Sequence, residues 1–198
     1  KFAFNSGYVE EAKSLGEKFM HAFPNNRPVV GISASCVGFI KTRYKEIFHN
    51  SSYHLDCNKL VGNIYEITDF IVNKLHKDYF EAVFRHKAAY LDSCSSLREL
   101  GLRHEARQLL SKVNGLELVE LKNPEICCGM GKGLFPLQHE AISSSLADQK
   151  LKDAMDAGAE YLITNDISCL MHLNSYAKKQ GLPIEVIHIV DVLTSGWE

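Results

Sequence analysis

The sequence contains no long apolar segment, and its longest apolar runs, such as Pro28–Ile32, extend over only a handful of residues. A helix that spans a bilayer takes about 20 consecutive apolar residues, so no membrane-spanning segment is expected. No signal peptide is visible either. We therefore expect a cytoplasmic protein, with any contact to a membrane made through other proteins.

An excess of charge of one sign is also absent, because 22 Lys and Arg residues stand against 24 Asp and Glu residues. The formal net charge is -2 and the pI is about 6.5. Nucleic-acid binding draws on clustered basic residues, so nucleic acid is not an expected partner. With 45% hydrophobic and 23% charged residues, the composition excludes a disordered chain, collagen and a coiled coil.

Strand-like and helical patterns alternate along the 198 residues. Short apolar or alternating runs predict strands, and longer runs with a period near 3.6 residues predict helices. This alternation predicts an α/β fold with mainly parallel sheets, covered by helices. The predicted strands are Pro28–Ile32, Ala88–Leu91, Leu116–Leu121, Tyr161–Thr164 and Ile184–Ile189, and the predicted helices are Val9–Phe23, Val37–Phe48, Val61–Leu75, Leu97–Val113, Leu137–Ala157 and Leu170–Lys179.

The two halves of the chain repeat one pattern. A helix, a strand and Ser33-Ala-Ser-Cys36 in the first half parallel a helix, a strand and Asp166-Ile-Ser-Cys169 in the second. We predict two related domains, 1–83 and 84–198, the first of them incomplete at its N-terminus. Chance similarity of two α/β units is the alternative. The chain begins at Lys1 without a methionine, so we expect a fragment or a processed product.

Four of the six cysteines, Cys94, Cys127, Cys128 and Cys169, follow strands or strand-like segments. Without a secretory segment, metal or redox chemistry is a better expectation than disulfides. The carboxyl ends of parallel strands lie along one edge of a sheet, so these residues are expected to converge there. Thiolates suit zinc or iron–sulfur clusters. Buried core cysteines are the alternative, but that interpretation does not account for four cysteines at strand ends.

The adjacent pair Cys127-Cys128 bears on which metal is bound. Structural zinc sites more often use cysteines separated by two to four residues, whereas a multi-iron cluster offers each thiolate its own iron. The glycines that follow, Gly129 and Gly131, would let backbone N–H groups approach the sulfurs, and Lys132 would add positive charge. The sequence therefore favours an iron–sulfur cluster, with zinc as the alternative.

A glycine-rich segment before a helix can also cradle phosphates. The segment Gly129-Met-Gly-Lys-Gly133 does not fit G-x-G-x-x-G, and no Ser or Thr follows its lysine as in a P-loop. Nucleotide binding is therefore not predicted.

Other polar residues carry weaker signals. His172 falls three residues after the last of the four cysteines, on the first turn of a predicted helix, and either assists the site or is an ordinary surface or capping histidine. Arg98 either faces an anion or pairs with Glu99 or Glu105. Cys57 is expected to be an ordinary exposed thiol in a polar loop. No Ser-His-Asp or Cys-His nucleophile arrangement is recognisable, and the histidines expected to be solvated or structural are His86, His104, His139 and His188.

Three motifs together resemble those of the cysteine-rich CCG-domain proteins: Asp92-Ser-Cys94 with Leu97-Arg-Glu-Leu-Gly101, Ile126-Cys-Cys-Gly129, and Asp166-Ile-Ser-Cys-Leu-Met171. That family includes the cysteine-rich subunit of heterodisulfide reductase, the glycolate oxidase iron–sulfur subunit and the lactate-utilisation type, and the chain is most similar to the last. The resemblance covers nearly the whole chain. It implies Cys94, Cys127, Cys128 and Cys169 as ligands of the second domain's cluster and Cys36 as a ligand in the first.

One departure from the family pattern bears on the cluster. Heterodisulfide reductase-type domains end in C-x-x-C, whereas here the equivalent positions are Cys169 with His172 and Cys36 with Phe39. A conventional four-cysteine cluster of the 4Fe-4S type, alone or with His172 assisting, is therefore expected. Thiol–disulfide chemistry of the heterodisulfide reductase kind is not.

The resemblance implies an iron–sulfur electron-transfer subunit of a system that oxidises L-lactate to pyruvate. Its partners would be the other subunits of a lactate- or glycolate-oxidising complex. The chain carries no flavin or nicotinamide signature, so hydride chemistry would belong to another subunit. The alternatives are the iron–sulfur subunit of glycolate oxidase and a subunit with a structural zinc.

Overall fold

The computed structural model describes residues 1–24, 27–132 and 134–196, and it has the predicted α/β fold. Its strands form two sheets in which every neighbouring pair is parallel. The smaller sheet pairs β1 with β2, and the larger has the order β4-β3-β5-β6. The strands are β1 (Val29–Gly31), β2 (Ile64–Glu66), β3 (Lys87–Leu91), β4 (Glu117–Val119), β5 (Tyr161–Thr164) and β6 (Glu185–His188).

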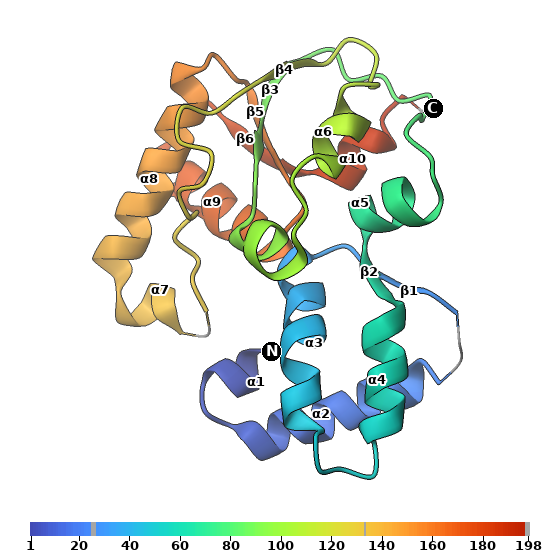
Figure 1. The fold of residues 1–198 in the computed structure, drawn as a ribbon. Coiled ribbons are helices and arrows are strands. Elements are labelled where there is room, and N and C mark those ends of the chain that lie inside the picture. The colour runs from blue at the N-terminus through green and yellow to red at the C-terminus, as the bar shows by residue number, and fades with distance from the viewer. Residues whose placement is uncertain (25–26, 133, 197–198) are drawn as a thin grey trace.

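Helices cover both faces of the larger sheet. Successive side chains of a strand point to opposite faces, so each strand contributes to two separate cores. Ala89 and Leu91 of β3 pack in the core under α8 and α9, whereas Ala88 and Tyr90 pack in the core under α6 and α10. Figure 1 shows α8 and α9 on one side of this sheet and α6 and α10 on the other. The helices are α6 (Glu105–Leu110), α8 (Glu140–Asp156), α9 (Ile167–Gln180) and α10 (Ile189–Leu193).

The first half of the chain is mainly helical and has a core of its own (Figure 1). Cys57 lies in this core and is only 1% exposed, so the prediction of an exposed thiol is wrong. The physical reason is that Cys57 lies on a helix, on the same face as Leu60 and Val61, three and four residues further on. The helices of this half are α1 (Phe2–Asn5), α2 (Val9–Ala22), α3 (Ala34–Ile47) and α4 (His54–Asn63).

Three predicted helices are interrupted. The run Val61–Leu75 contains β2, because Ile64 pairs with Val29 and is buried. The chain then continues through α5 (Ile67–Asp69) and the short π-helix η1 (Phe70–Lys74). The run Leu97–Val113 is divided at Gly101, whose φ of +72° lies in the left-handed region that ends helices. This run forms the short π-helix η2 (Ser96–Leu100) and, after Gly101, α6. The predicted helix Leu137–Ala157 begins instead as α7 (Phe135–Gln138), followed by α8.

The repeated strand–turn–helix unit is present in both halves with the same local geometry. Ser33 joins β1 to α3 with φ −127° and ψ 110°, and Asp166 joins β5 to α9 with φ −128° and ψ 115°. Cys36 and Cys169 are each the third residue of the helix that follows. The parallel seen in the sequence therefore extends to backbone conformation.

The two halves meet through these same turns. The Ala34 N–H donates to the Asn165 carbonyl oxygen at 3.1 Å, and the His188 Nε2 lies 2.8 Å from the Ile32 carbonyl oxygen. Ala82 packs in the core under α6 and α10. The division into domains 1–83 and 84–198 stays a prediction. None of the helices in the described part of the chain is long and apolar enough to cross a membrane.

Candidate metal centre

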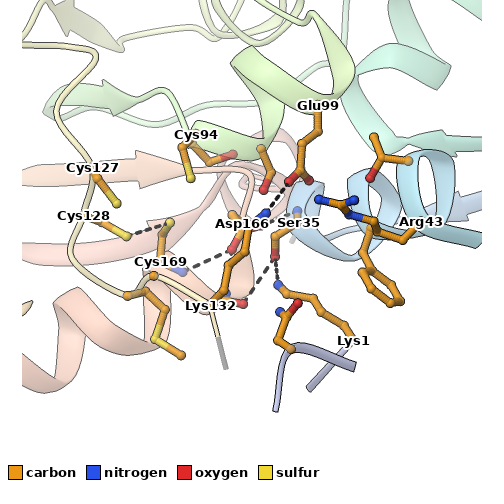
Figure 2. Close-up of a pocket in the computed structure, with 18 of the residues that line it drawn as sticks. Lys1, Ser35, Arg43, Cys94, Glu99, Cys127, Cys128, Lys132, Asp166 and Cys169 are labelled. Atoms are coloured by element: carbon orange, nitrogen blue, oxygen red, sulfur yellow. Dashed lines mark hydrogen bonds and ion pairs between the residues drawn. The ribbon is translucent and has the colours of Figure 1, made fainter. Parts of the chain in front are cut away.

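Four cysteine side chains converge at the carboxyl edge of the larger sheet and line one cavity of ≈ 220 Å³. Cys94 comes three residues after the end of β3, Cys127 and Cys128 lie in the loop between β4 and α7, and Cys169 is in the first turn of α9. Figure 2 shows the four sulfurs on one side of this cavity. Parallel strands bring these distant segments together, as the sequence predicted.

The sulfur atoms form a row in the order Cys94, Cys127, Cys128, Cys169. The Cys128 Sγ donates to the Cys169 Sγ at 3.0 Å, and Cys127 interacts with the thiols of its two neighbours in the row, Cys94 and Cys128. Cys128 and Cys169 are only 4% and 6% exposed, whereas Cys94 and Cys127 are half-buried. We call this set the sulfur row. All four are free thiols.

The loop after Cys128 turns backbone N–H groups toward the sulfurs. The Gly129 N–H donates to the Cys127 Sγ at 3.4 Å, and the Gly131 N–H acts on the same sulfur. Gly129 has a φ of +93°, and a Cβ atom added there would lie 2.4 Å from the Ser143 carbonyl oxygen. Only glycine suits this position, because both the backbone angle and the close approach of α8 exclude a side chain.

Hydrogen bonding within the sulfur row separates the acidities of its thiols. Hydrogen bonding with the thiols of Cys128 and then Cys94 holds the pKa of Cys127 well below the ordinary value, with the Gly129 and Gly131 N–H groups acting in the same direction. The pKa of Cys94 is raised by hydrogen bonding with Cys127 and by burial, and the pKa of Cys128 is raised by hydrogen bonding with Cys127 and Cys169 and by burial. The centre of the row thus favours a thiolate.

Polar groups of the first half form the opposite wall of the cavity (Figure 2). The Asp166 Oδ2 accepts from the Ser35 N–H at 2.6 Å, while its Oδ1 accepts from the Cys169 N–H at 3.2 Å. Lys132, which we expected to add positive charge, also lines the cavity, but its Nζ pairs with Glu99 at 3.2 Å. The sulfur row therefore faces a polar interface between the two halves.

Of the remaining predicted site residues, Cys36 lies apart from the sulfur row and His172 lies beside the loop that contains Gly129. Cys36 is exposed and lines a different, apolar cavity beside β1. His172 is in the second turn of α9, because that helix begins three residues earlier than predicted, and its Nε2 lies 3.2 Å from the Ser143 Oγ. That hydroxyl donates to the Gly129 carbonyl oxygen at 2.8 Å. His172 therefore contacts the glycine loop through Ser143.

The predicted partners of Arg98 are engaged elsewhere. Arg98 is exposed, Glu99 pairs with Lys132, and the Glu105 Oε2 accepts backbone N–H groups at the start of α6.

Among the predicted structural histidines, His188 is 4% exposed and its Nδ1 accepts from the Val190 N–H. Gly133, the last residue of the glycine-rich segment, lies outside the described residues.

The donor set fits a soft metal or an iron–sulfur cluster. It consists of four thiols with backbone N–H donors beside them, which is the ligand chemistry that thiophilic metals require. Within the described residues, no three His, Cys, Asp or Glu side chains are arranged to hold a single metal ion as they stand. The four sulfurs line one cavity, and thiolates are ligands of both zinc and iron–sulfur clusters.

Two residues that support the site were missed by sequence reasoning. Asp166 caps α9, and an Asp directly before a helix is a recognised start signal that could have been used. Ser143 lies in the middle of a predicted helix, and its contact with the glycine loop has no signal in the sequence.

Comparisons with known proteins match these observations. The family described as "Cysteine-rich domain" (CCG) matches residues 88–174, a range that contains the whole sulfur row. "Lactate utilization protein A 2" of Bacillus cereus (strain Q1) and "Lactate utilization protein A 1" of Bacillus anthracis (strain CDC 684 / NRRL 3495) are each 35% identical over 195 residues, which is 98% of this chain and 80% of the relative. "Lactate utilization protein A" of Oceanobacillus iheyensis is 35% identical over 197 residues, which is 99% of this chain and 80% of the relative.

Proposed function

The chain belongs to the lactate utilization protein A family, and from this premise we propose that it is an iron–sulfur electron-transfer subunit of a system that oxidises L-lactate to pyruvate. Partner subunits would take the two electrons and two protons from lactate and pass the electrons on to this protein. A cluster bound here supplies a one-electron carrier. Cys94, Cys127, Cys128 and Cys169 would hold it.

The observation that carries this proposal is the sulfur row, in which residues from three separate segments meet in one cavity. The loop N–H groups of Gly129 and Gly131 stabilise negative charge on sulfur, which is what a thiolate-bound cluster needs. Burial of Cys128 and Cys169 keeps water from that end of the row. These features support a redox group rather than a hydrolytic site.

The metal content of the protein tests the proposal. The full-length protein, purified without oxygen, should contain iron and acid-labile sulfide in comparable amounts and absorb broadly in the visible range until a reductant is added. Cys128→Ser should lose iron and sulfide but keep its helical content. Cys57→Ser is the matched control, because that cysteine is buried in the core of the first half, and it should keep both. Zinc without sulfide, or unchanged iron in Cys128→Ser, would overturn the assignment.

Growth tests address the substrate. Deletion of the gene should abolish growth on L-lactate as sole carbon source and leave growth on pyruvate unchanged. A wild-type copy should restore growth, and a Cys128→Ser copy should not. Loss of growth on glycolate in place of lactate would reassign the protein to glycolate oxidation.

A further inference from the structure

A buried lysine lies behind the loop that carries Cys127 and Cys128. Lys150 is on α8 and is 0% exposed. Its Nζ donates to the carbonyl oxygen of Asn123 at 2.6 Å and to that of Pro124 at 3.3 Å. Both contacts are with acceptors, which suits an ammonium group. The two carbonyls come four and three residues before Cys127, so Lys150 holds the start of this loop.

Asp153, one turn further along α8, holds the same loop by accepting hydrogen bonds, whereas Lys150 donates them. Its Oδ1 accepts from the Lys122 N–H at 3.0 Å and its Oδ2 accepts from the Asn123 N–H at 2.8 Å. Together the two side chains engage both N–H and carbonyl groups of one short segment. The loop that carries the adjacent cysteines is thus anchored to a long helix by two charged groups.

Lys150 lies on α8 next to the core that contains two cysteines of the sulfur row. Ala147 and Leu151, beside it on α8, pack in the same core as Cys128 and Cys169. Within the described residues, no carboxylate lies within ion-pair distance of the Lys150 Nζ, although Asp153 and Asp92 act on it from further away. A buried charge without a close counterion acts strongly on neighbouring negative groups, because the surrounding dielectric is low.

The charges that act on Lys150 are consistent with this placement. Burial lowers the pKa of the Lys150 ammonium, and the groups that raise it are, in order, Asp153, Asp92, Cys128 and Cys127. The Lys150 ammonium and the thiols of Cys127 and Cys128 therefore act on each other electrostatically.

We propose that Lys150 is a positioning residue for the sulfur row: it fixes the backbone that carries Cys127 and Cys128, and its buried charge stabilises the reduced form of the group bound there. The charge role rests on the proposed iron–sulfur function, whereas the backbone role does not. Adding an electron to a thiolate-bound cluster increases its negative charge, so a nearby cation favours reduction.

Three substitutions at one position separate the two roles. Lys150→Met removes the donor and the charge at similar length, Lys150→Gln keeps a neutral donor, and Lys150→Arg keeps both. Lys152→Met is the matched control, because Lys152 is on the same helix but exposed, where it pairs with Asp148 at 2.7 Å. Circular dichroism identifies any variant that fails to fold. If Lys150→Met does not fold, Lys150→Leu replaces it in the exchange experiment and Lys150→Gln in the redox titration.

The backbone role is tested on the metal-free full-length protein by hydrogen exchange. Lys150→Met should raise amide exchange in residues 122–131 by about tenfold or more, and Lys152→Met should leave it unchanged. Wild-type exchange in a folded Lys150→Met variant would overturn this role. Because no metal is present, the result stands whether or not the proposed function holds.

The charge role is tested by redox titration of the anaerobically purified proteins. Lys150→Met and Lys150→Gln should lower the ratio of reduced to oxidised protein at a fixed potential on the order of tenfold, which is about 59 mV for a one-electron couple. Lys150→Arg and Lys152→Met should titrate like the wild type. An unshifted Lys150→Gln would overturn the charge role. Absence of iron and sulfide from the wild type would overturn it together with the proposed function.

Discussion

The Asp166 Oδ2 accepts a hydrogen bond from the Ser35 N–H at 2.6 Å, across 131 residues of sequence. The Ser33 Oγ donates to the same oxygen at 3.3 Å. The other carboxylate oxygen, Oδ1, accepts from the Ser168 and Cys169 N–H groups at the start of α9. One carboxylate therefore joins the two halves of the chain and orients the helix that carries the last cysteine of the sulfur row.

Substitutions at Asp166 should separate these two contributions. Asp166→Asn keeps an acceptor for α9 but presents an NH₂ group to Ser35, so it should lower the free energy of unfolding by about 2 kcal/mol. Asp166→Ala loses the helix cap as well and should cost about 3 kcal/mol. Urea unfolding measures both. Ser168→Ala, which removes only a 3.4 Å hydroxyl contact with Ser35, is the control and should stay within about 0.5 kcal/mol.

Glu66 is a second buried carboxyl group close to this junction. Its side chain is 0% exposed, and burial raises its pKa from 4.5 to about 7, against the lowering effect of hydrogen bonds from Thr68 and Asp69. Within the described residues, its Oε1 and the Asn165 Oδ1 are buried without a hydrogen-bond partner. A protonated Glu66 avoids an uncompensated buried charge at this place.

The raised pKa predicts a pH-dependent stability. Because folding raises the pKa, the folded state holds a proton that the unfolded state has released between about pH 4.5 and pH 7. The free energy of unfolding should therefore fall as pH rises through this window, by up to about 3 kcal/mol from this group. Glu66→Gln, which is neutral throughout, should lack that component. Urea unfolding between pH 5 and pH 8 measures this difference. If the free energy of unfolding changes with pH in the same way in the wild type and in Glu66→Gln, the prediction is contradicted.

Gly129 should not tolerate a side chain. Gly129→Ala would place a Cβ atom 2.4 Å from the Ser143 carbonyl oxygen at a φ of +93°, so it should displace the loop and reduce metal retention at least tenfold. Gly101→Ala is the matched control, since that φ is +72° but nothing lies within 4 Å of the added atom. It should cost about 1 kcal/mol of stability and leave metal content unchanged. Equal metal content in the two variants would rule out a role for close packing at Gly129.

Local pattern was sufficient for most of the fold. The strands β3, β5 and β6 were predicted within one residue at each end, because short apolar runs bounded by turn residues have few other interpretations. The local pattern gave the wrong prediction at Ile64–Glu66, where a strand interrupts a run of residues with helical periodicity. Pairing with Val29, which lies 35 residues away from Ile64, decides the conformation there, and no local pattern records such a pairing.

Local pattern along the chain is enough to predict an α/β fold and four cysteines that follow strands. Because the carboxyl ends of parallel strands lie at one edge, it also predicts that these cysteines converge. The packing of the folded chain determines which sulfurs touch and places Cys36 apart from them. It also decided that Lys150 lies behind the loop of Cys127 and Cys128. These relationships depend on how separate segments pack against one another. Residues that meet only through such packing share no spacing along the chain, so a linear sequence cannot display the contact.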